Sequence, residues 1–100
     1  MSSSPGEKPA RPKLQIQLDD TTARGHYANL ALINHSENEF ILDFAFMQPG
    51  AHAARVVSRV ISTPKHAKRL LRALAHNVER YEQRHGKIEI DERDLEPPIH

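Results

Sequence analysis

Apolar and polar residues alternate along several short segments in the first two thirds of the chain, a pattern typical of strands in an antiparallel sheet. The segment 14–18 reads LQIQL, and the segments of about 26–34 and 40–47 flank the polar loop NHSENE as the two arms of a hairpin. The segment 54–62, ARVVSRVIS, is rich in β-branched residues and predicts a fourth strand. The short segment KIEI at 87–90 is a candidate for one more.

A different spacing begins after residue 62 and predicts one long helix. Thr63 is a suitable N-cap, Pro64 suits the first helical position, and Gly86 is suited to end the helix. Apolar residues recur between these ends at intervals of three and four: Ala67, Leu70, Leu71, Leu74, Val78 and Tyr81. The predicted fold class is therefore α+β, an antiparallel β-meander of about four strands followed by one long amphipathic helix packed on one sheet face.

The predicted sheet carries apolar residues on both faces. In the segment 40–47, alternation places the three phenylalanines and Leu42 on one face and Asp43 on the other, together with further apolar residues. One helix covers only one face of a sheet, so the second apolar face needs another partner, for which a second copy of the chain is the simplest candidate. We expect a homodimer or higher oligomer with a protein interface drawn from Phe40, Leu42, Phe44, Phe46, Val57 and Ile61.

The two ends of the chain differ in composition from its middle. Residues 1–13 are rich in Ser, Pro and Lys and predict a disordered arm, and residues 91–100 predict an acidic flexible tail, which leaves 14–90 as a single domain. There is no cysteine, and the start of the sequence lacks the apolar stretch of a signal peptide. No run approaches the roughly 18 apolar residues of a membrane span. We expect a soluble, cytoplasmic protein without a membrane partner.

Charge is unevenly distributed, although the formal net charge is only +1. Between residues 51 and 78 the chain has no Asp or Glu, and it has these basic residues: Arg55, Arg59, Lys65, Lys68, Arg69 and Arg72. A solvated helix face usually mixes both signs, and basic groups at a helix N-terminus are slightly unfavourable with the helix dipole. The basic run is therefore the exposed side of a helix first, and a candidate surface for an anionic partner second.

Arg55 and Arg59 admit two interpretations. Strict alternation places both on one face of the strand 54–62, among β-branched residues, where plain solvent exposure is unusual for arginine. Contact with phosphate beside a base-stacking surface is one interpretation. An arginine–carboxylate pair, for instance with Asp43 of the same or a second chain, is the other and is favoured.

Common catalytic and metal-binding patterns are missing from the sequence. No two of its seven histidines have the i, i+4 spacing of helical zinc ligands, and its four glycines are isolated rather than grouped in a phosphate-binding loop. Ser36 stands beside His35 and Glu37, but neighbours in one loop do not form a catalytic triad. We expect no catalytic residue, no metal and no cofactor.

Several short motifs give the chain a resemblance to a known family. They are Tyr27-Ala28-Asn29, the stretch from Ser36 ending in Leu42-Asp43-Phe44, Pro49-Gly50, Ser58-Arg59-Val60, the helix around His66-Ala67-Lys68-Arg69-Leu70-Leu71, and then Asn77, Tyr81, Glu82 and Gly86. Over roughly residues 20–88 the chain resembles a family of small prokaryotic proteins catalogued only as a domain of unknown function. The resemblance implies a soluble, non-secreted, prokaryotic protein and implies no activity. The predicted order of elements is also similar to that of small dimeric modules that bind single-stranded nucleic acid, and to that of a tetrameric bacterial export chaperone.

Two functions of different classes follow from these patterns. The first is a non-catalytic, self-associating module whose basic strand–helix surface binds an anionic partner, with nucleic acid the leading candidate and an acidic protein or the acidic tail the alternatives. The near-neutral charge and the shortage of exposed aromatic residues, Tyr27 being the obvious one, count against nucleic acid. The second is a protein-interaction adaptor or scaffold, of a chaperone-like kind, that uses the apolar sheet face. An enzyme with an unrecognised site is a third and least favoured reading.

Overall fold

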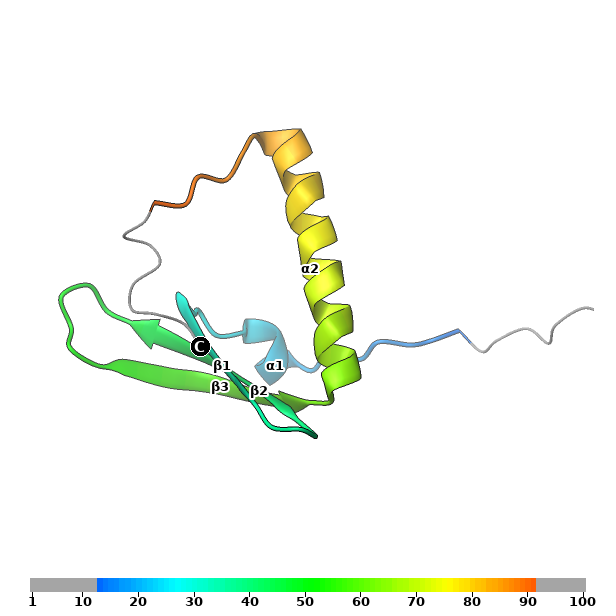
Figure 1. Cartoon of the computed structure of the whole chain (residues 1–100), viewed down its shortest axis with the longest axis horizontal. Coiled ribbons are helices and arrows are strands. Elements are labelled where there is room, and N and C mark those ends of the chain that lie inside the picture. The colour runs from blue at the N-terminus through cyan, green and yellow to red at the C-terminus, as the bar shows by residue number, and fades with distance from the viewer. Residues whose placement is uncertain (1–12, 92–100) are drawn as a thin grey trace, which may run out of the picture.

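The computed structural model describes residues 13–91, in which two helices and three strands follow one another (Figure 1). The predicted arm at 1–13 and the predicted tail at 91–100 lie, apart from one residue each, outside this described part of the chain. The elements are α1 (Asp20–Arg24), β1 (Leu30–His35), β2 (Phe40–Met47), β3 (Ala54–Ser62) and α2 (Pro64–His85). The α+β class and the order of a sheet followed by a long helix are thus as predicted.

The three strands form one antiparallel sheet in the order β1-β2-β3, which is the predicted meander without its first strand. Residues 14–18 were expected to be a strand, but they are extended chain outside the sheet, with Leu14, Ile16 and Leu18 largely exposed. Residues 87–90 form no strand either. Alternation alone does not make a strand, because the segment also needs a neighbouring strand to accept and donate its backbone hydrogen bonds.

The short helix α1 (Asp20–Arg24) is capped at both ends, by Asp19 and by Gly25. The Asp19 side chain accepts a hydrogen bond of 2.7 Å from the Thr22 backbone N–H. Hydrogen bonds from the backbone and the side chain of Thr22 lower the pKa of the Asp19 carboxyl. Gly25 ends the helix at φ +72°, a backbone conformation that favours glycine.

A β-bulge in β3 changes which face its residues occupy. The register pairs Asp43 with Arg59 and Phe44 with Ser58, but then pairs Ala45 with Val56. Val57 is therefore an extra residue on β3, and the alternation of side chains is interrupted there.

The bulge overturns the prediction that Arg55 and Arg59 share a face. Arg59 lies opposite Asp43, whereas Arg55 lies opposite Phe46, three residues further along β2. An odd separation along a strand means opposite faces, so the two arginines lie on opposite sides of the sheet. The alternation predicted for β2 itself, with Phe40, Leu42, Phe44 and Phe46 together on one face, agrees with the register.

The helix α2 begins where it was predicted to begin. Its N-cap Thr63 accepts a hydrogen bond of 3.2 Å from the His66 backbone N–H, and Pro64 stands in the first turn. Its C-cap Gly86 has φ +97°.

The helix does not lie along the sheet but rises steeply from the end of β3 (Figure 1). Much of its apolar stripe stays open to solvent: Leu71 is 66% exposed and Leu74 58%. Among the described residues the buried apolar core consists of Leu42 and Ala45, both on the central strand β2. A core this small contributes little stability to a single copy of the chain.

Candidate functional site

An arginine–carboxylate pair occupies the sheet face that carries Asp43. The Arg59 guanidinium donates two hydrogen bonds to the Asp43 carboxylate, from Nε at 2.7 Å and from Nη2 at 2.8 Å. The Asp43 side chain is 8% exposed and the Arg59 side chain 59%, so the carboxylate is shielded while part of the guanidinium meets solvent. The hydrogen bonds from Arg59 lower the pKa of the Asp43 carboxyl, and in return Asp43 raises the pKa of Arg59. The geometry agrees with the carboxylate-pair interpretation of Arg59, within one chain.

Arg55 lies beside aromatic residues on the other face of the sheet. It is paired across the strands with Phe46, and the Phe46 ring packs edge-on against the Tyr27 ring at a centroid distance of 5.8 Å. Tyr27 is 76% exposed. An exposed aromatic ring near an arginine is the combination that stacks a base and contacts its phosphate in single-strand binding proteins.

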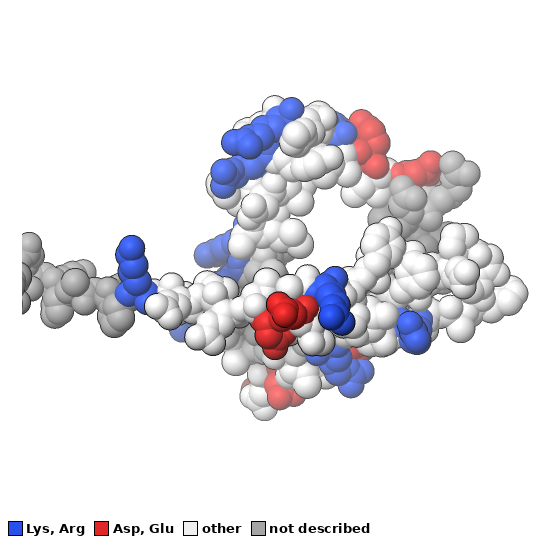
Figure 2. Space-filling view, turned by 180° about the vertical axis from the view of Figure 1, so that it is seen from behind, with Lys and Arg blue, Asp and Glu red and all other residues white. Residues whose placement is uncertain are grey.

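The predicted basic residues of α2 are all exposed. Figure 2 shows Lys and Arg side chains gathered at the end of the helix farthest from the sheet, with further basic side chains lower on the same side. Lys65, Arg69 and Arg72 follow one another at intervals of four and three and so share one side of the helix. Within residues 13–91, none of these three side chains, nor that of Lys68, forms an ion pair. Their positive charge is therefore not neutralised by that part of the chain.

An apolar cleft of about 560 Å³ separates the first half of α2 from the sheet. The sheet contributes Ile33, Phe40 and Leu42 to its lining. The helix contributes Pro64, Ala67, Lys68, Leu70, Leu71 and Leu74. Of the predicted interface residues, the structure thus brings Phe40 and Leu42 together with α2, whereas Ile61, opposite Ile41, lies on the other face of the sheet.

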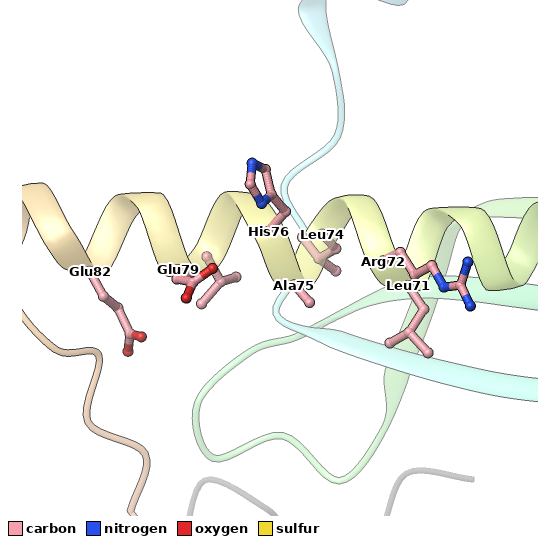
Figure 3. A pocket seen from close by; sticks show the side chains of 8 residues that line it. Leu71, Arg72, Leu74, Ala75, His76, Glu79 and Glu82 are labelled. Carbon is pink, nitrogen blue, oxygen red and sulfur yellow. The ribbon is translucent and has the colours of Figure 1, made fainter.

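A second, shallow groove runs along α2 itself (Figure 3). Figure 3 shows Leu71, Ala75 and Glu82 pointing to the same side of the helix, into the space above the strands, while His76 points the other way. The Glu82 carboxylate accepts a hydrogen bond of 2.9 Å from the Ile88 backbone N–H, which draws the chain after α2 back towards the helix. The prediction from sequence included neither Ala75 nor Glu82 in any site. Their separation of seven residues, about two helical turns, places both on one side of the helix and is the sequence feature that could have identified them.

Asn29 extends the hairpin by one residue through its side chain. Its Oδ1 accepts a hydrogen bond from the Met47 backbone N–H, its Nδ2 donates one to the Met47 carbonyl, and both are 2.9 Å long. The side-chain amide thus imitates a strand residue opposite Met47, just before β1 begins. No property of the hydrophobic pattern indicated this role, although Asn29 belongs to one of the motifs noted above.

Two kinds of feature are absent from the described residues, a cluster of metal-binding side chains and a membrane-spanning helix. Within 13–91, no three His, Asp or Glu side chains come close enough together to hold a metal ion. No helix in the same range is both long enough and apolar enough to span a bilayer. The surfaces that stand out are the basic outer side of α2, the aromatic residues beside Arg55 and the open apolar cleft.

The fold and these surfaces define a small α+β protein with a long helix that is basic on one side and largely uncovered on its apolar side. The chain belongs to a family described as a protein of unknown function (DUF3467), whose sequence profile matches residues 1–90. A search of curated proteins and a search of solved structures each gave no significant match.

Proposed function

We propose that the chain is a non-catalytic, self-associating, cytoplasmic module that binds single-stranded nucleic acid through the basic outer side of α2. The observation that carries the proposal is the row formed by Lys65, Arg69 and Arg72, which is exposed and has no ion-pair partner among residues 13–91. Such a row neutralises backbone phosphates and releases their counterions. Lys68 stands at the edge of the row.

In this proposal the remaining basic residues have different roles. Arg55, beside Phe46 and the exposed Tyr27, supplies a place where a base can stack. Arg59 is already held by Asp43 and lies on the opposite sheet face from Arg55, so its contribution to phosphate binding is the smallest of the set. Single-stranded rather than double-stranded nucleic acid is favoured because stacking needs an unpaired base.

The test is a titration of a fluorescently labelled, mixed-sequence single-stranded oligonucleotide, followed by anisotropy at several salt concentrations. The double variant Arg69→Glu/Arg72→Glu should bind every oligonucleotide sequence more weakly. The magnitude of the negative slope of log K against log salt should decrease by about 1.4, because two phosphate contacts are lost. The matched control is Arg24→Glu/Lys87→Glu, which changes the net charge equally but leaves the outer side of α2 intact. Equal loss in both double variants, or no loss in either, would contradict the proposal.

A further inference from the structure

The apolar residues of α2 follow a heptad repeat. Ala67, Leu71, Leu74, Val78 and Tyr81 are separated by four and three residues in alternation; Leu70, also apolar, lies beside this row, and the polar His85 takes the next position. This average period of 3.5 residues is the one that keeps an apolar seam facing a second helix along its whole length. The seam covers most of the 22 residues of α2, a length of about 33 Å.

The later part of the seam is open to solvent, whereas Ala67, Leu71 and Leu74 line the cleft between α2 and its own sheet. Figure 2 shows an opening between the later part of α2 and the sheet, and Leu74, Val78 and Tyr81 are all exposed. The seam and the cleft share Ala67, Leu71 and Leu74 and so form one continuous apolar surface.

One edge of the seam determines the direction of the second helix. Lys68, Ala75 and Glu82 are seven residues apart and form a single row beside the seam, with a positive charge at one end, a small residue in the middle and a negative charge at the other. In an antiparallel pair of identical helices, such a row meets its own copy in reverse order. Lys68 then lies against Glu82 of the second copy, and Ala75 meets Ala75 at the two-fold axis. A parallel pair would make neither ion pair.

We propose that the seam is covered by α2 of a second copy of the chain, antiparallel to the first, around a two-fold axis beside Ala75. This inference rests on the self-association included in the proposed function and gives it a geometry. Two Lys68–Glu82 ion pairs flank the axis, and the Ile88 N–H that holds Glu82 fixes the position of its carboxylate. The row formed by Lys65, Arg69 and Arg72 stays on the outside of the pair.

Sedimentation equilibrium without oligonucleotide tests the pairing by charge exchange. Lys68→Glu and Glu82→Lys should each put two like charges against each other at both places where residue 68 of one copy meets residue 82 of the other. Each should therefore weaken dimerisation by about tenfold. The double variant Lys68→Glu/Glu82→Lys restores opposite charges between copies and should return to within about twofold of the native protein. Lys65→Glu, the same charge change on the outer side, is the control and should dimerise normally. A double variant no stronger than the single ones, or a monomeric native protein, overturns the proposal.

Cross-linking provides a second test that requires no charge reversal at the interface. The native chain has no cysteine, so single cysteines can be introduced at will. With a short bis-maleimide, Ala75→Cys should form covalent dimers readily, whereas Lys68→Cys should not, because an antiparallel pair separates the two copies of residue 68. Efficient cross-linking of both variants indicates a parallel pair and overturns the proposal. Neither test uses nucleic acid, so failure of the pairing and failure of phosphate binding are separate results.

Discussion

Arg59 and Asp43 face each other directly across β3 and β2 and are joined by two parallel hydrogen bonds. This arrangement exists because of the extra residue Val57, which sets the register of β3 beyond the bulge. The pair ties a shielded carboxylate to a half-exposed guanidinium. It connects the two strands at the centre of a sheet that has almost no apolar core of its own.

The stability contributed by this pair should depend on pH. Arg59 lowers the pKa of Asp43 in the folded state below the value of about 3.9 expected in the unfolded chain. The contribution is therefore fully present above that unfolded value and is lost as the pH falls through the folded pKa. Denaturant unfolding between pH 2 and 7 should show the native protein losing more stability on acidification than Asp43→Asn does.

Asp19 also has a lowered pKa, but it is present in both proteins and cancels in the comparison of Asp43→Asn with the native chain. Arg59→Lys keeps the positive charge and loses the two-point geometry, so its stability at pH 7 should lie between those of the native protein and Asp43→Asn. Parallel pH profiles for the native protein and Asp43→Asn would show that the pair has no such role.

Removal of the Asn29 side chain should loosen one end of the hairpin. Asn29→Ala loses both hydrogen bonds to the Met47 backbone and should reduce the free energy of unfolding by about 1–2 kcal/mol. Faster hydrogen exchange at the Met47 amide is the local sign of this loss. Asn34→Ala, an exposed asparagine within β1, is the matched control and should change both quantities little. Equal effects of the two substitutions would contradict the role assigned to Asn29.

Lys65→Glu should separate stability from binding. The first turn of α2 contains no acidic residue, and a negative charge there interacts favourably with the helix dipole by about 0.3–1 kcal/mol. We therefore expect a higher midpoint in thermal unfolding together with weaker oligonucleotide binding. Lys65→Gln should show part of both changes. A less stable variant, or one that binds as tightly as the native protein, would contradict this expectation.

Local patterns predicted most of the fold. Alternation located β2 and β3, and the capping residues Thr63 and Gly86 located the ends of α2, because each of these features depends on neighbours in sequence. Whether residues 14–18 join the sheet depends on whether a neighbouring strand is available to them, and alternation does not reveal this. The faces assigned to Arg55 and Arg59 were wrong because a bulge carries no clear signal in a strand that is rich in β-branched residues.

The candidate surfaces were predicted only in part. The exposure of the basic residues of α2 followed from helical periodicity, and Asp43 was correctly named as a carboxylate for Arg59. The open apolar side of α2 was not foreseen, because the same stripe fits a helix packed on its own sheet. Only the position of the helix relative to the strands distinguishes the two arrangements, and that is a property of the whole fold.

The bulge at Val57 determines the face of the sheet on which the residues of β3 to either side of it lie. A substitution changes the side chain at one position, whereas a one-residue bulge changes the face of the sheet on which every residue beyond it lies. Deletion of Val57 would remove the bulge and leave Arg55 opposite Phe46 and Arg59 opposite Asp43, because the two arginines would then be three residues apart in a regular strand. A relative with the same strand length but no bulge would instead carry both arginines on one face, so the bulge itself divides this positive charge between the two faces of the sheet.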